Sequence, residues 1–162
     1  MGIPMVLLLC ALLIPEGNVV RLPHQTQFNV RESDEILFKN TRSPHYTFQE
    51  NTLWGSTLFY PKDWEDMPLL LMINLQWRTD EASILWITSE DQEVIDLGID
   101  GISHPFDPMN SREYHQKMSF VVFNALSNSQ EITIHQKPLT PSQKSKLESV
   151  LKDYLRLVHK VP

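Results

Sequence analysis

The chain has 162 residues, of which 41% are hydrophobic and 21% are charged, and its formal net charge is −6. These proportions are typical of a folded globular protein and exclude a disordered chain, while the length suits a single domain with its own core. An acidic protein repels phosphate groups, so nucleic-acid binding is not expected. Cys10 is the single cysteine, which excludes a framework of internal disulfides.

The N-terminus carries an uncharged apolar run at residues 3–14. The run is shorter than the roughly 20 residues that a membrane-spanning helix needs, so no integral membrane span is expected. Its length suits a secretory signal, and we expect residues 1–17 to be either a signal peptide or an apolar segment buried in the fold. A cleaved signal predicts a secreted or periplasmic protein. A retained segment predicts a cytoplasmic subunit of a complex, with its apolar N-terminus packed into a partner.

Residues 18–52 are polar and irregular, and we expect them to be weakly ordered or to form edge structure. Residues 53–162 show clearer patterns and are predicted to form a single globular domain. Apolar or alternating runs in this part are typical of β-strands. Strands are predicted at residues 57–60, 69–77, 84–87, 94–99, 118–123 and 131–135.

The C-terminal segment carries the signals of an amphipathic helix. Thr140 is a typical N-cap, Pro141 suits the first helical position, and Gln143 completes a capping box. Apolar residues then recur at helical spacing, at Leu147, Val150, Leu151, Tyr154, Leu155 and Val158. The sequence therefore predicts an α+β fold, in which a mainly antiparallel sheet of about five strands has this helix packed on one face.

No motif of a known catalytic or cofactor chemistry occurs in the chain. It lacks a glycine-rich phosphate loop, a His-Glu-x-x-His zinc pair and a Gly-x-Ser-x-Gly elbow. No cofactor is therefore expected, and the favoured function is that of a small non-catalytic interaction domain.

An alternative function rests on residues 101–117, which show no periodicity and are predicted to form a long loop. Two imidazoles and two carboxylates in this segment have the chemistry of ligands for a divalent metal ion. These candidate metal ligands are His104, Asp107, Glu113 and His115. The alternative is a metal-assisted hydrolase centred on residues 104–115, although the spacing matches no established ligand pattern.

Acidic residues are concentrated in the middle of the chain. Residues 62–107 contain eleven acidic side chains and two basic ones, whereas residues 137–162 contain six basic side chains and two acidic ones. The tips of hairpins in one sheet often lie at the same end, which would concentrate the acidic charge and suit a basic protein partner. The candidate partner-binding residues are Asp63, Trp64, Glu65, Asp66, Asp80 and Glu81.

The four tryptophans are expected mainly in the core. Trp77 and Trp86 flank one turn and are expected to pair across it. Trp54 and Trp64 are expected to be buried as well, or, if exposed, to anchor an interface, since tryptophan is enriched at binding hot spots.

Overall fold

The structure, a computed structural model, describes residues 28–88 and 94–158. The prediction for residues 1–17 lies outside this part of the chain. The described part contains three α-helices, a 3-10 turn and eight strands. In chain order they are α2 (Glu32–Thr41), η1 (Ser43–His45), β1 (Tyr46–Asn51), β2 (Ser56–Pro61), β3 (Leu70–Gln76), β4 (Glu81–Ile87), β5 (Ile95–Ile99), β6 (Ile102–Phe106), α3 (Arg112–Ser127), β7 (Ile132–Ile134), β8 (Lys137–Pro138) and α4 (Pro141–Leu157).

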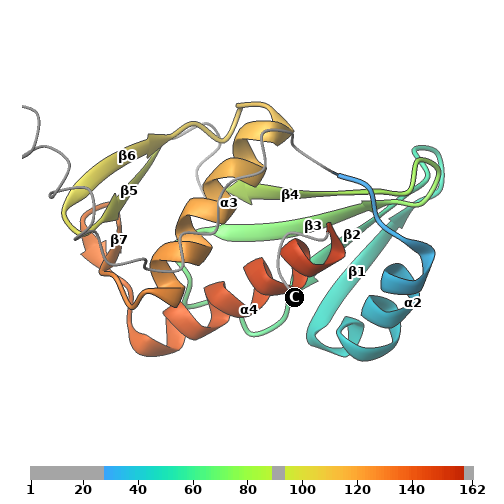
Figure 1. The fold of residues 1–162 in the computed structure, drawn as a ribbon, viewed down its shortest axis with the longest axis horizontal. Helices are drawn as coiled ribbons and strands as arrows, with labels where there is room; N and C mark the ends of the chain where they lie inside the picture. The colour runs from blue at the N-terminus through green and yellow to red at the C-terminus, as the bar shows by residue number, and fades with distance from the viewer. Residues whose placement is uncertain (1–27, 89–93, 159–162) are drawn as a thin grey trace, which may run out of the picture.

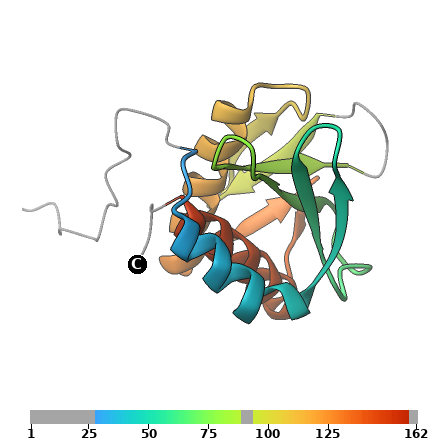
Figure 2. The same cartoon turned by 90° about the vertical axis from the view of Figure 1, so that its right-hand side faces the viewer.

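The eight strands form two antiparallel sheets of four strands each. The first sheet has the order β1-β2-β3-β4, and the second has the order β6-β5-β7-β8. The three helices lie on the same side of the first sheet (Figures 1 and 2). The predicted α+β class is therefore confirmed, and a C-terminal helix is present. Two four-stranded sheets, however, replace the single sheet of about five strands.

The inner face of the first sheet packs on the helices. The register places Phe59 opposite Ile73 and Ile73 opposite Ile84, and strand alternation turns all three toward this face. Trp86 lies on the same face, and its indole Nε1 donates a hydrogen bond to Ser119 Oγ of α3 at 2.8 Å. The sheet and α3 therefore share one core.

Met118–Phe123, predicted as a strand, lies within helix α3 instead. A short apolar run looks the same in a buried strand and in a helix that is buried on most of its sides, and this run is of the second kind. Ser111 is the N-cap of the helix, and its side chain accepts a hydrogen bond from the Tyr114 backbone N–H. Because β6 and the start of α3 occupy most of residues 101–117, the prediction of a long loop there is wrong.

The predicted C-terminal helix is confirmed as α4, including both hydrogen bonds of its capping box. The Gln143 backbone N–H donates to Thr140 Oγ1 at 3.2 Å, and the Thr140 backbone N–H donates to Gln143 Oε1 at 2.9 Å. Leu147, Leu151 and Leu155 are fully buried. Since α4 contacts α2, α3 and β4, its apolar stripe belongs to the core.

Helix α2 and strand β1, the edge strand of the first sheet, are held by a buried carboxylate of α4. Both oxygens of Asp153 accept hydrogen bonds from Arg42 Nε, at 2.8 and 2.9 Å, and Oδ2 also accepts one from the Tyr46 hydroxyl at 2.8 Å. Phe38 of α2 meets Phe59 edge to face, with ring centroids 5.1 Å apart. A polar cluster and an aromatic cluster together fix this segment against the core.

Candidate functional site

The candidate site lies on the face of the first sheet that points away from the three helices, which we call the open face (Figure 2). Alternation and register place two groups of side chains on it. The group near the β2–β3 connection is apolar and consists of Tyr60, Leu70, Met72, Leu85 and Ile87. The group near the hairpin tips is mainly polar and includes Asn51, Ser56, Asn74, Gln76, Glu81 and Ser83, with Leu58 beside Asn74.

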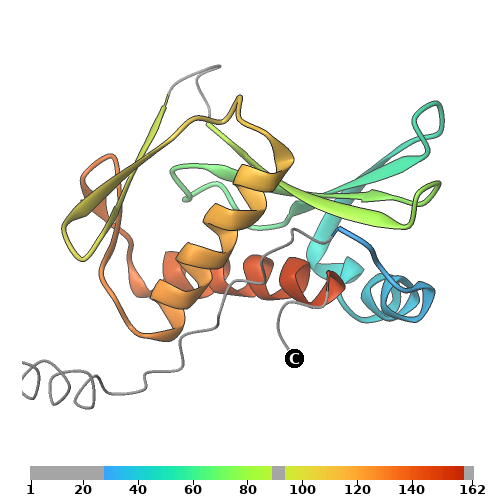
Figure 3. The same ribbon diagram turned by 45° about the horizontal axis from the view of Figure 1, so that its top comes forward.

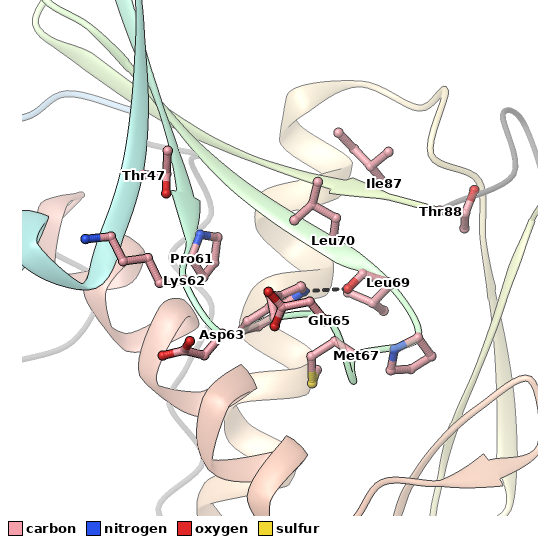
Figure 4. A pocket seen from close by; sticks show the side chains of 12 residues that line it. Thr47, Pro61, Lys62, Asp63, Glu65, Met67, Leu69, Leu70, Ile87 and Thr88 are labelled. Atoms are coloured by element: carbon pink, nitrogen blue, oxygen red, sulfur yellow. Dashed lines mark hydrogen bonds between the residues drawn. The ribbon is translucent and has the colours of Figure 1, made fainter.

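A groove of about 700 Å³ lies at the apolar end of the open face, beside the loop at residues 62–69 (Figure 4). We call it the loop groove. Leu70 and Ile87 line it from neighbouring strands and point to the same side. Asp63 and Glu65 line it from the loop, and both are exposed. The groove thus joins an apolar floor to an acidic rim.

Hydrogen bonds hold the 62–69 loop in shape. Trp64 is only 8% exposed, and its Nε1 donates to the Leu69 carbonyl oxygen at 2.6 Å, the dashed line in Figure 4. Lys146 of α4 donates from Nζ to the Asp63 carbonyl oxygen and to Asp66 Oδ1, both at 2.5 Å. The hydrogen bond from Lys146 lowers the pKa of the Asp66 carboxyl below its ordinary value. Because internal bonds and α4 both fix the loop, the groove is formed without a ligand.

Asp63 and Glu65 give the loop groove a net negative charge, since they outnumber Lys62, the one basic residue among its described lining residues. Lys62 directs its ammonium to a backbone carbonyl oxygen 3.0 Å away, and Asp66 is paired with a lysine of α4. Within the described part of the chain, neither Asp63 nor Glu65 forms an ion pair. Their charge is therefore available to a cationic group of a partner.

The structure divides the predicted partner-binding residues between the two ends of the first sheet. Three of the carboxylates lie in the 62–69 loop, whereas Asp80 and Glu81 lie at the β3–β4 turn. The seven residues of β3 place about 20 Å between these ends. Consecutive turns of an antiparallel sheet lie at opposite ends of the strand that they share, so the expectation of a single acidic end is wrong. Glu81 is also paired with Arg112, with Oε2 and Nη1 2.8 Å apart.

The four tryptophans divide between the core and the surface. Trp64 and Trp86 are buried, whereas Trp54 is 77% exposed and Trp77 is 42% exposed. The expected pairing of Trp77 with Trp86 is wrong, because the register places Trp86 opposite Leu71 and Trp77 lies beyond the end of β3. We did not predict that Trp54 and Trp77 lie close together at the hairpin tips. The sequence feature that could have indicated this is that Trp54 and Trp77 each lie beside a turn.

The structure does not bring the four predicted metal ligands together. His104 lies on the edge strand β6, Asp107 lies between β6 and α3, and Glu113 lies in the first turn of α3. His115 is buried and uses both ring nitrogens: Nδ1 accepts from the Trp86 backbone N–H at 3.0 Å, and Nε2 donates to a backbone carbonyl oxygen at 3.1 Å. Burial lowers the pKa of His115, which favours this neutral form. Among the described residues, no group of three or more His, Cys, Asp or Glu side chains is arranged to hold a metal ion.

None of the described helices is long and apolar enough to cross a membrane. In comparisons with family models, curated proteins and solved structures, the chain matches none of them.

Proposed function

We propose that the chain is a non-catalytic binding domain that takes up a basic segment of a protein partner in the loop groove. One observation carries this proposal: a preformed groove combines an apolar floor, at Leu70 and Ile87, with two carboxylates, Asp63 and Glu65, that form no ion pair with any described residue. A partner segment that carries both apolar and basic side chains matches this lining, because each kind of side chain meets its complement there.

The two parts of the groove have different effects on binding. Burial of apolar side chains on the floor supplies affinity, whereas the exposed carboxylates attract the partner at a distance and exclude acidic competitors. Association should therefore slow as salt shortens the screening length to about 8–10 Å and below.

Two synthetic peptides test the proposal, one alternating lysine with leucine and one alternating glutamate with leucine. We expect the lysine peptide to shift the amide NMR signals of Leu70 and Ile87, and to bind more weakly as the salt concentration rises. The variant Asp63→Asn/Glu65→Gln should lose most of this binding. The matched control Asp80→Asn removes a carboxylate at the far end of β3 and should bind as the wild type does. Equal binding of both peptides, or equal binding by the wild type and the double variant, contradicts the proposal.

We further propose that the domain acts in a secreted or periplasmic setting, because the apolar run at residues 3–14 has the length of a signal peptide core. This support comes from the sequence alone. Intact mass spectrometry of the protein from its native host should show a mature chain that begins near residue 18. A chain that still begins at Met1 would instead favour a cytoplasmic subunit whose apolar N-terminus packs into a partner.

A further inference from the structure

The tips of the β1–β2 and β3–β4 hairpins lie side by side at the end of the first sheet that is remote from the loop groove (Figures 1 and 3). A hydrogen bond of 3.0 Å from the Trp77 backbone N–H to the Gly55 carbonyl oxygen joins them. Arg78 adds two more, from Nη1 to the Leu53 carbonyl oxygen and from Nη2 to the Thr52 carbonyl oxygen, both at 3.1 Å. The two tips therefore form one cross-linked unit.

This unit presents an exposed indole on a stiff backbone. Gly55 has a φ of +64°, and a Cβ at this position would overlap the Arg78 side chain, so the close approach requires glycine. The Arg78 guanidinium also lies 5.4 Å from the ring centroid of Trp77. The backbone N–H of Trp54 donates to Asn51 Oδ1 at 3.2 Å. Because the backbone that carries Trp54 is already fixed, little ordering remains to oppose the binding of a ligand.

A cleft of about 410 Å³ adjoins Trp54, and we call it the tip cleft. Trp54 and Leu58 supply the apolar part of its lining. The rest consists of three amide side chains, two hydroxyl side chains and Arg78, whose terminal nitrogens already bind backbone carbonyl oxygens. None of the described residues that line the cleft carries a carboxylate. Among the amides, Asn74 Oδ1 is buried and has no hydrogen-bond partner in the described structure, which leaves an acceptor for a donor on a ligand.

We propose that the tip cleft binds a neutral carbohydrate, with one sugar ring stacked on Trp54. Sugar hydroxyls donate and accept hydrogen bonds at closely spaced positions, and amide and hydroxyl side chains do the same. The C–H bonds on one face of a pyranose ring carry partial positive charge, and the electron-rich face of an indole attracts them. Among the described lining residues, a cationic ligand would find no carboxylate, and an anionic ligand would find both terminal nitrogens of Arg78 already bonded to backbone carbonyl oxygens.

The test titrates maltose, cellobiose, lactose, mannobiose and diacetylchitobiose into the full chain and follows binding by calorimetry and tryptophan fluorescence. We expect at least one disaccharide to bind at one site and to change the fluorescence. Trp54→Ala should weaken that binding about tenfold or more, because the stacking platform is lost. Leu53→Ala is the matched control, since it removes another exposed apolar side chain of the same tip that does not line the cleft. Its affinity should equal that of the wild type.

Two results would overturn the proposal: failure of every disaccharide to bind, or equal binding by Trp54→Ala and the wild type. Partition onto phosphatidylcholine vesicles that both Trp54→Ala and Leu53→Ala abolish, with no sugar bound, would overturn it in favour of a membrane surface. The variant Asp63→Asn/Glu65→Gln should leave the sugar affinity unchanged. The outcome at the tip cleft is therefore distinguishable from the outcome at the loop groove.

Discussion

Asp153 holds α2 and β1 against α4, and removing its carboxylate tests how this part of the fold is stabilised. Asp153→Ala leaves the buried Tyr46 hydroxyl without its acceptor and Arg42 without its ion-pair partner, although Arg42 Nη2 keeps its hydrogen bond to Ser149 Oγ. An unpaired buried hydroxyl costs about 1–3 kcal/mol. The Arg42 side chain is 35% exposed, so water replaces much of the lost pairing, and this loss adds about 1 kcal/mol or less. We expect the free energy of unfolding to fall by about 1–4 kcal/mol, somewhat less than when one partner of a fully buried ion pair is removed.

Urea unfolding, followed by tryptophan fluorescence, measures this free energy. Tyr46→Phe removes only the hydroxyl and should cost about 1 kcal/mol. Combined with Asp153→Ala it should cost less than the sum of the two changes, because both remove the same hydrogen bond. Relative to the wild type, Asp153→Ala should speed the hydrogen exchange of the α2 amides more than that of the α4 amides. A loss below about 1 kcal/mol for Asp153→Ala, or additive costs in the double variant, would show that the hydrogen bonds of Asp153 do not stabilise this segment.

Three further predictions concern the stability of the fold: a core leucine, a helix cap and the protonation of a buried histidine. Leu151→Ala should lower the free energy of unfolding by about 2–5 kcal/mol, because the fully buried side chain leaves a cavity beside α4; an unchanged melting curve would contradict its burial. Thr140→Ala should cost about 1 kcal/mol by thermal or urea unfolding, and Thr140→Ser, which keeps the capping oxygen, should restore most of it. Burial lowers the pKa of His115 in the folded chain, so as the pH falls the histidine of the unfolded chain is protonated before that of the folded chain. Protonation then favours the unfolded chain, and the free energy of unfolding should fall as the pH drops below about 6.5. His115→Gln should keep a nearly constant urea midpoint over the same pH interval, and parallel pH curves for both proteins would exclude His115 as the cause.

Helix α4 could be predicted from the sequence because every signal that defines it is local. The cap, the proline and the capping-box glutamine lie within four residues, at 140–143, and the apolar positions follow at one spacing. Nothing in the rest of the chain overrides these signals, since the helix buries the face that its spacing indicates.

Helix α3 could not be predicted in the same way, because polar residues in its buried part hide the period. His115 and Ser119 lie in the core and bond to Trp86, and Gln116 Nε2 donates to the Tyr154 hydroxyl at 2.7 Å. A pattern that assigns polar residues to the surface therefore misses three of the buried positions of this helix. Their hydrogen bonds to Trp86 of β4 and Tyr154 of α4 explain why these polar side chains are buried.

The candidate sites were partly readable from the sequence. The concentration of acidic charge led to Asp63 and Glu65 as candidate partner-binding residues, and the structure places both on the surface. The distance between the acidic groups depends on which end of β3 each turn occupies. The strand order of the sheet decides this, and no short stretch of sequence reveals it. The cleft beside Trp54 likewise lies between two hairpin tips that are distant in sequence, joined by Arg78 and by the hydrogen bond from Trp77 to Gly55.

The chemistry of the open face argues for two local sites rather than one large interface. A sheet face that packs against a covering helix or a second sheet is apolar along its whole length, because the covering element buries all of it. Here Leu70 and Ile87 make one end apolar, whereas Asn74 and Gln76 make the other end largely polar, with Trp54 and Leu58 as its apolar part. A single apolar partner spread over the whole face would bury those amides without hydrogen bonds, which opposes binding. Separate ligands, one at each end, meet no such penalty, and this is why the charge variants at the loop groove and the tryptophan variant at the tip cleft should act independently.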